Sequence, residues 1–98
     1  MAAFAIKRTA RGRLEASGVL GFDTAADALK SGLKLIDGDA CTIDLGNVTE
    51  GDSAGLAVLI EWLTAARVRG AKLNYEKVPG QILAIARISD VDDLLTDP

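Results

Sequence analysis

One stretch of the chain decides the fold: Cys41–Leu63, CTIDLGNVTEGDSAGLAVLIEWL. It begins with an apolar run typical of a buried strand, passes through a polar turn, and enters a long apolar helix at Asp52 and Ser53. The first backbone N–H groups of a helix have no partners within it. A helix start that carries Asp, Ser and Gly at the surface is therefore a natural docking point. We expect the functional site at this turn.

Strands and helices alternate on both sides of this stretch. Residues 3–9 and 13–20 alternate apolar with polar side chains, and Gly12 supplies the positive φ of a tight hairpin between them. The later elements are a helix from Asp23-Thr24 to about Ile36, a strand over 40–45, a helix over 53–69, a strand over 71–78, a helix from Pro79 and a short acidic turn over 90–98. The predicted order is β-β-α-β-α-β-α.

Right-handed crossovers place the later strands in a mostly parallel sheet, with the hairpin at its edge. We therefore predict an α/β fold in which helices pack on a mixed β-sheet. Loops that follow the carboxyl ends of parallel strands share one edge of the sheet. Gly21 and Asp23 then lie on the same edge as the turn before the second helix.

The length and composition bound the class of protein. The chain has 98 residues, no histidine and one cysteine, Cys41. A chain of this length buries roughly 60–70% of its unfolded surface, which supports a core without disulfides or metals. We interpret residues 1–98 as a single domain and Cys41 as a small buried hydrophobe. Because the commonest general base and a common zinc ligand are missing, we expect no enzyme activity, no metal site and no cofactor.

Charge and hydropathy limit the classes of partner that the chain can bind. The net charge is −3, and one tryptophan, one tyrosine and two phenylalanines make up the aromatic residues. Nucleic-acid binding requires a basic face with aromatic platforms, so we exclude nucleic acid as a partner. No apolar run approaches the ~20 residues that cross a bilayer. We expect a cytoplasmic protein that reaches a membrane only through a partner.

The second helix carries two apolar stripes on a helical wheel. The stripe that should face the sheet contains Leu56, Leu59, Ile60 and Leu63, and the stripe nearly opposite contains Ala54, Val58, Trp62 and Ala65. One interpretation of the second stripe is a protein-binding patch, because tryptophan is enriched among interface anchors. The other is that Val58 and Trp62 pack beneath a neighbouring helix.

The central stretch resembles the signature of STAS domains, the sulfate-transporter and anti-sigma-factor-antagonist family. In that family, a strand ending in Asp-Leu is followed by Asp-Ser-Ser/Thr-Gly-Leu at the start of a helix. The matching residues here are Asp44, Leu45, Asp52, Ser53, Gly55 and Leu56. The resemblance implies the STAS fold, a mixed sheet with a hairpin at its edge, and covers nearly the whole chain.

One position departs from the phosphorylated members of the family. Ala54 replaces the hydroxyl that kinases phosphorylate in anti-sigma-factor antagonists. In this respect the chain is similar to the short stand-alone STAS subunits of Mla-type phospholipid transporters. The resemblance implies a cytoplasmic accessory protein that binds the ATPase subunit (MlaF-like) of an inner-membrane ABC transporter.

We predict that the turn and the first outward turns of the second helix bind this ATPase. The predicted partner-binding residues are Asn47, Thr49, Asp52, Ser53, Ala54, Val58 and Trp62. Whether the isolated chain forms a homodimer is left open by the sequence.

The same residues are compatible with other functions. An anti-sigma-factor antagonist would use Ser53 as the phosphoacceptor, although Glu50 and Asp52 would repel the phosphate. A receiver-type phosphoacceptor at Asp44 would need a lysine opposite and a further acidic group near the first strand to hold magnesium, and the sequence does not place that acidic group. Taken singly, Ser53 is also explained as a helix cap and Asp44 as a hydrogen-bond acceptor that fixes a loop.

Overall fold

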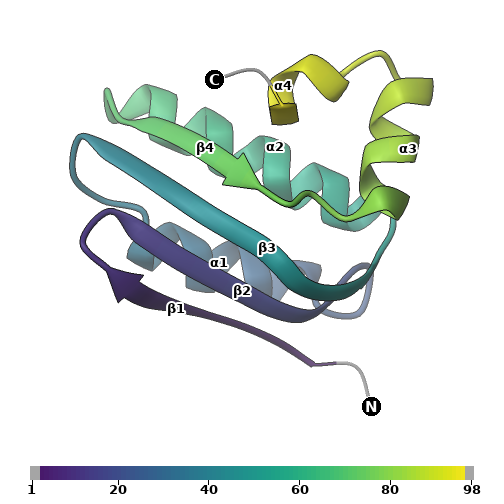
Figure 1. Cartoon of the computed structure of the whole chain (residues 1–98), viewed down its shortest axis with the longest axis horizontal. Helices are drawn as coiled ribbons and strands as arrows, with labels where there is room; N and C mark the ends of the chain where they lie inside the picture. Colours follow the sequence, from purple (N-terminus) through teal and green to yellow (C-terminus); the bar gives the residue numbers. More distant parts are fainter. Residues whose placement is uncertain (1–2, 97–98) are drawn as a thin grey trace.

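The fold is a four-stranded sheet with helices, seen in a computed structural model that describes residues 3–96, apart from the side chain of Thr96 (Figure 1). The strands are β1 (Phe4–Ala10), β2 (Arg13–Leu20), β3 (Ala40–Gly51) and β4 (Lys72–Glu76), in the spatial order β1-β2-β3-β4. β1 pairs antiparallel with β2, and the other pairs are parallel. The predicted α/β fold with a mixed sheet is confirmed.

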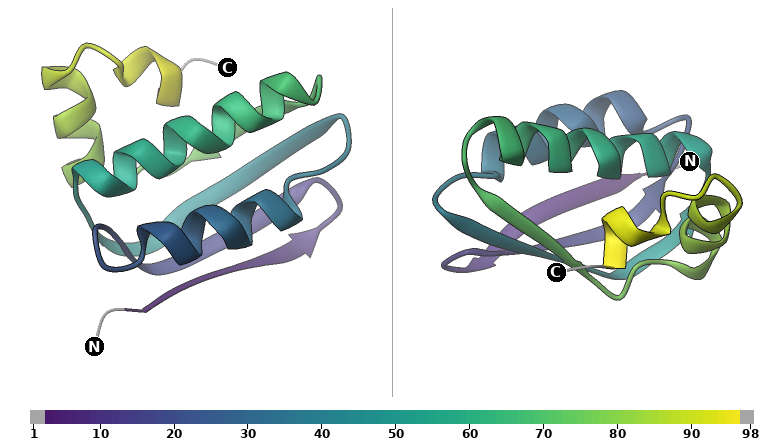
Figure 2. Two further views of the ribbon diagram at one scale, coloured as in Figure 1. Left: turned by 180° about the vertical axis from the view of Figure 1, so that it is seen from behind. Right: turned by 90° about the horizontal axis from the view of Figure 1, so that it is seen from above.

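The helices are α1 (Ala25–Leu35), α2 (Ser53–Val68), α3 (Gly80–Ile88) and α4 (Asp92–Thr96). α1 and α2 lie side by side across one face of the sheet, whereas α3 and α4 lie toward the β4 side (Figure 2). The predicted order β-β-α-β-α-β-α is confirmed, with α4 in the place of the expected last turn. Asp97 and Pro98, the end of that turn, lie outside the described residues.

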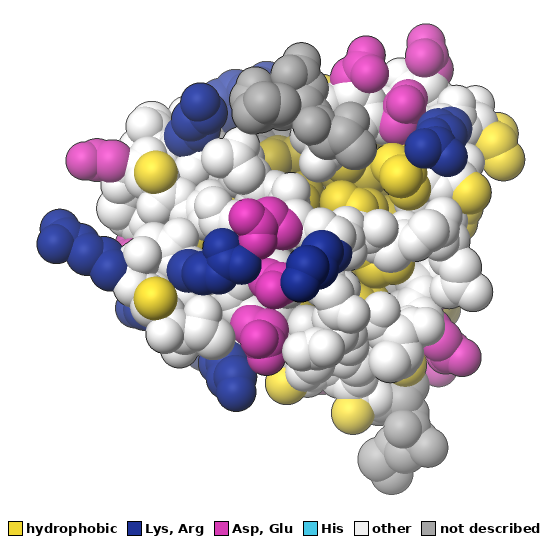
Figure 3. Space-filling model, in the orientation of Figure 1, with side chains coloured by type: hydrophobic (Ala, Val, Ile, Leu, Met, Phe, Trp, Pro, Cys, Tyr) yellow, Lys and Arg dark blue, Asp and Glu magenta, His cyan; other side chains and the backbone are white. Residues whose placement is uncertain are grey.

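The other face of the sheet is polar because the strands alternate. The Arg13 guanidinium lies 2.5 Å from Glu76 Oε1 and 3.7 Å from Asp44 Oδ2, so one cation joins three strands. Acidic and basic side chains meet in the middle of this face (Figure 3). The hairpin that brings Arg13 there turns at Gly12, whose φ of +71° confirms the expected left-handed backbone.

The predicted turn over residues 46–51 is wrong, because β3 continues through it to Gly51. β3 pairs with β2 along this segment, from Ser17 opposite Asn47 to Leu20 opposite Gly51, and the register shifts at two points. Each shift inserts an extra residue in β3, as a β-bulge does. A bulged strand accommodates glycine and polar residues. Because these residue types also favour turns, the sequence of residues 46–51 suggests a turn.

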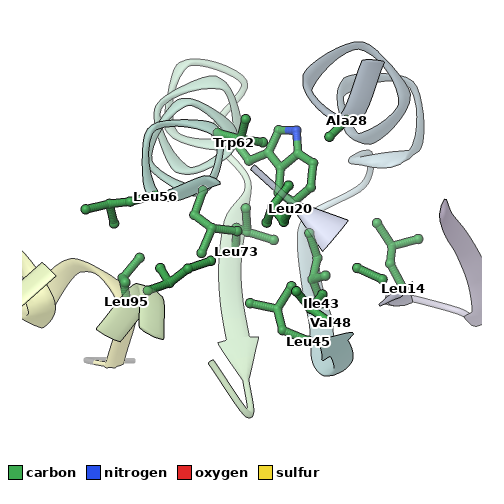
Figure 4. Packing of buried hydrophobic residues seen from close by; sticks show 14 of the residues in the cluster. Leu14, Leu20, Ala28, Ile43, Leu45, Val48, Leu56, Trp62, Leu73 and Leu95 are labelled. Atoms are coloured by element: carbon green, nitrogen blue, oxygen red, sulfur yellow. The ribbon is translucent and has the colours of Figure 1, made fainter. Parts of the chain in front are cut away.

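The expectation that Val58 and Trp62 form an outward patch is also wrong. Trp62 is 0% exposed and Val58 is 4% exposed. The indole lies between α1 and α2 (Figure 4), where its Nε1 donates a hydrogen bond to the Leu29 carbonyl at 3.3 Å. The packing interpretation is therefore confirmed: a helix that lies beside another helix on a sheet must bury a flank as well as its underside. Cys41 is 4% exposed, as expected of a buried hydrophobe.

Candidate functional site

Asp52 organises the start of α2. Its Oδ1 atom accepts hydrogen bonds from the backbone N–H groups of Ala54 at 2.9 Å and Gly55 at 3.1 Å, which makes Asp52 the N-cap. Its Oδ2 atom accepts from the Phe22 N–H at 3.1 Å. One carboxylate thus ties the β2–α1 connection to the first turn of α2. The Phe22 hydrogen bond, together with those from Gly55 and Ala54, lowers the pKa of Asp52 below its ordinary value of 3.8.

We expect Asp52→Ala to lower the free energy of unfolding by about 1 kcal/mol at neutral pH, because the cap and the tether to Phe22 are both lost. The folded pKa lies below the unfolded one, so this stabilisation is present above the unfolded pKa. It disappears as pH falls through the folded value. Urea unfolding of both proteins should show a gap at neutral pH that closes below about pH 4. Asp39→Ala, at an exposed carboxylate at the other end of the sheet, is the control, and a gap that does not change with pH would contradict this role.

Ser53 is the first residue of α2 and is exposed. The cap interpretation of Ser53 is wrong, because Asp52 supplies the capping oxygen. Within the described residues, the Ser53 hydroxyl makes no hydrogen bond. It is therefore available to another molecule.

Gly55 has a packing role inside the fold. A Cβ at this position would stand 2.0 Å from the Leu20 carbonyl oxygen, so glycine lets α2 approach the end of β2. The backbone that approaches Gly55 closely belongs to this chain itself. That contact holds the helix start against the sheet.

Phe22 is the functional candidate that the sequence reasoning missed. It lies in the connection between β2 and α1, and 73% of its surface is exposed. Gly21 and Asp23, on either side, were placed at the correct edge of the sheet. The signal for Phe22 was the one aromatic residue in a short polar connection before a helix.

The structure does not bring all the predicted partner-binding residues together. Asn47 and Thr49 flank the buried Val48 in β3 and so point away from the core, and Thr49 Oγ1 donates to the Gly18 carbonyl at 3.3 Å. Of the predicted residues, Asp52, Ser53 and Ala54 lie together at the start of α2. With Phe22, Asp23 and Glu50, which were not among the predicted partner-binding residues, they form what we call the α2 rim, and all six are at least partly exposed.

The family model described as "Mlab, STAS domain" matches residues 5–96. The chain belongs to the STAS domain family. No curated protein matches it.

The signature Asp44 of this STAS domain fixes its own strand. Its Oδ1 accepts from the Gly46 N–H at 2.8 Å, and its Oδ2 lies 3.7 Å from Arg13 and 4.0 Å from Lys77. The interpretation of Asp44 as a hydrogen-bond acceptor is confirmed, but its partner Gly46 lies within β3 and not in a loop. Among residues 3–96, no three His, Cys, Asp or Glu side chains are placed to hold a metal ion.

The surface of the described residues is hollowed both beside the α2 rim and away from it. A depression of about 220 Å³ adjoins the α2 rim and is lined by Glu50, Asp52 and Gln81, among others. A larger hollow of about 480 Å³ lies between α2, β4 and α4, and no residue of the rim lines it. In the described part of the chain, no helix is both long and apolar enough to span a membrane.

Proposed function

We propose that this STAS domain is a non-catalytic subunit that binds and regulates the ATPase of a Mla-type phospholipid ABC transporter, on the cytoplasmic side of the inner membrane. Such a transporter would maintain the lipid asymmetry of the outer membrane. The observation that carries the proposal is the Ser53 hydroxyl of the STAS signature, which stands exposed because Asp52 caps the helix. The match to a family model described with the name Mlab supports the choice of transporter.

The rim favours binding over chemistry. A nucleophilic Ser53 would need a general base within reach. The adjacent Asp52 accepts three backbone hydrogen bonds and has a lowered pKa, so it is a poor proton acceptor. A protein without chemistry of its own still changes the turnover of an enzyme if it binds one conformation better than another. We propose that the subunit acts on the ATPase in this way.

The proposal is tested with Ser53→Arg. A tagged copy of the chain should retain the transporter ATPase in a pull-down and change its rate of ATP hydrolysis. Ser53→Arg places a long cation in the middle of the rim and should abolish both effects, while unfolding at the wild-type temperature. Ser89→Arg, the same change at the exposed end of α3, is the matched control. If Ser53→Arg is folded and binds as wild type does, the α2 rim is not the interface.

The second candidate is an anti-sigma-factor antagonist regulated by a serine kinase. The exposed Ser53 at a helix N-terminus favours it, since helix N-termini stabilise phosphate groups. Glu50 and Asp52 oppose it by charge repulsion. The intact mass after incubation with the cognate kinase separates the two. Addition of one phosphoryl group, absent from Ser53→Ala, would favour the antagonist.

A further inference from the structure

We infer that the ATPase surface covering the α2 rim is an apolar socket for Phe22 bordered by lysine and arginine side chains. This inference rests on the proposed function and names the chemistry of the partner surface. It depends on two independent features: an aromatic ring held outward on a fixed backbone, and the sign of the charges around it.

The backbone that carries Phe22 is held on both sides. Its own N–H is bonded to Asp52 in α2. On the other side, Thr24 is 6% exposed, and its hydroxyl donates to the Val19 carbonyl at 2.8 Å and accepts from the Gly21 N–H at 3.0 Å. The ring, in contrast, is 73% exposed. An aromatic side chain on a fixed backbone loses little conformational freedom on binding, which is what an interface anchor requires.

Packing within the fold does not account for the position of the Phe22 ring. The core between α1 and α2 is closed by Trp62, and the Phe4 ring packs near it at 6.2 Å between centroids. Phe22 is outside this cluster. Its ring therefore contributes little to folding and is free to enter a partner.

The charges near Phe22 decide the chemistry of the partner. Asp23, Glu50 and Asp52 are exposed on the rim, and Asp27 and Glu61 are exposed farther along the same helices. No lysine or arginine occurs in residues 14–29 or 35–66, the two segments that contain the whole rim. Lys77, in the β4–α3 connection, has its Nζ atom 4.0 Å from Oδ2 of Asp44, which is not a residue of the rim. The partner surface that complements this field is positive.

Several basic residues lie at the opposite end of the sheet. Arg11 is at the hairpin tip, Arg67 and Arg69 are at the end of α2, and Lys72 begins β4. In Figure 3, several of the lysine and arginine side chains lie on the left, at the hairpin end of the molecule. The domain is therefore polarised, and a basic partner surface would attract the rim and repel the hairpin end.

The test is the affinity of the purified chain for the transporter ATPase, at low and at high salt. Phe22→Ala should weaken binding by at least about ten-fold, the loss typical of an anchor residue. Glu50→Lys should slow association, and high salt should weaken wild-type binding, because the attraction is between exposed charges. The controls are Ile88→Ala, at an apolar residue that is 87% exposed on α3, and Asp39→Lys, at an exposed acid beyond α1. Both controls should bind as wild type does.

The outcomes separate the inference from the proposed function. If wild type binds but Phe22→Ala and Glu50→Lys bind equally well, the socket is disproved and the ATPase remains the partner. If Glu50→Lys binds more tightly, the partner surface is acidic and the inference is wrong. If wild type itself does not bind the ATPase, the proposed function and the inference both fail. Thermal unfolding of each variant shows that a loss of binding is not a loss of fold.

Discussion

Trp62→Ala is expected to lower the free energy of unfolding by about 3–5 kcal/mol, the range for emptying a buried aromatic site. The indole is fully buried, and it fills the seam between α1 and α2. A Cβ placed at Gly32 of α1 would stand 2.3 Å from the ring, so the two helices meet on it. A small domain has only about 5–15 kcal/mol in total, so this loss is a large fraction of its stability. The unfolding temperature should fall by more than about 12 °C.

Two further variants serve as comparisons for the loss of stability in Trp62→Ala. Trp62→Phe keeps most of the ring but removes the hydrogen bond to Leu29, so its loss should be smaller than that of Trp62→Ala. Phe22→Ala removes an aromatic ring that is 73% exposed, and it should unfold within about 0.5 kcal/mol of wild type. Denaturant curves followed by circular dichroism suit all three. Equal stability of Trp62→Ala and wild type would contradict the packing of the two helices.

Gly55→Ala is expected to destabilise the domain by about 1–3 kcal/mol or more, as overpacking does. The added Cβ would lie 2.0 Å from the Leu20 carbonyl oxygen, and this obstacle is backbone. No rotamer change relieves such a clash. The start of α2 would have to move away from the end of β2, and the Asp52 bridge to Phe22 would move with it.

Gly80→Ala is the matched control for this prediction. Gly80 begins α3, and a Cβ there would meet nothing within 4 Å. The substitution should leave the domain unchanged or stabilise it by about 0.4–1 kcal/mol, because the unfolded chain loses freedom. If Gly55→Ala behaves like Gly80→Ala, the glycine of the STAS signature does not serve helix packing.

The strands and their order were predictable because their pattern is local. Residues 13–17 alternate partly exposed and buried side chains, and the structure gives β2 the predicted bounds. Right-handed crossovers then fix which strands run parallel. The end of β3 was not predictable, because its bulges are fixed by pairing with β2, far away in the sequence. Glycine, asparagine and threonine in that segment suggest a turn on their own.

The candidate site was predicted in part, for a related reason. A helical wheel shows that Trp62 lies opposite one apolar stripe, but not which neighbour covers it. The exposure of Phe22 was missed because a lone aromatic residue is normally assigned to the core, and its place in a short polar connection was the one signal against that assignment. Asp52 and Ser53 were placed correctly at the helix start. Only the structure shows that the Asp52 carboxylate caps the helix and leaves the Ser53 hydroxyl exposed.

The Asp52 carboxylate, by taking over the unpaired amides of α2, separates recognition from folding. The exposed side chains at the start of α2 are then not needed for capping. They can be substituted without disturbing the fold. A family whose members share this arrangement would acquire new partners by exchanging a few surface residues. Its specificity should then differ between members far more than its architecture does.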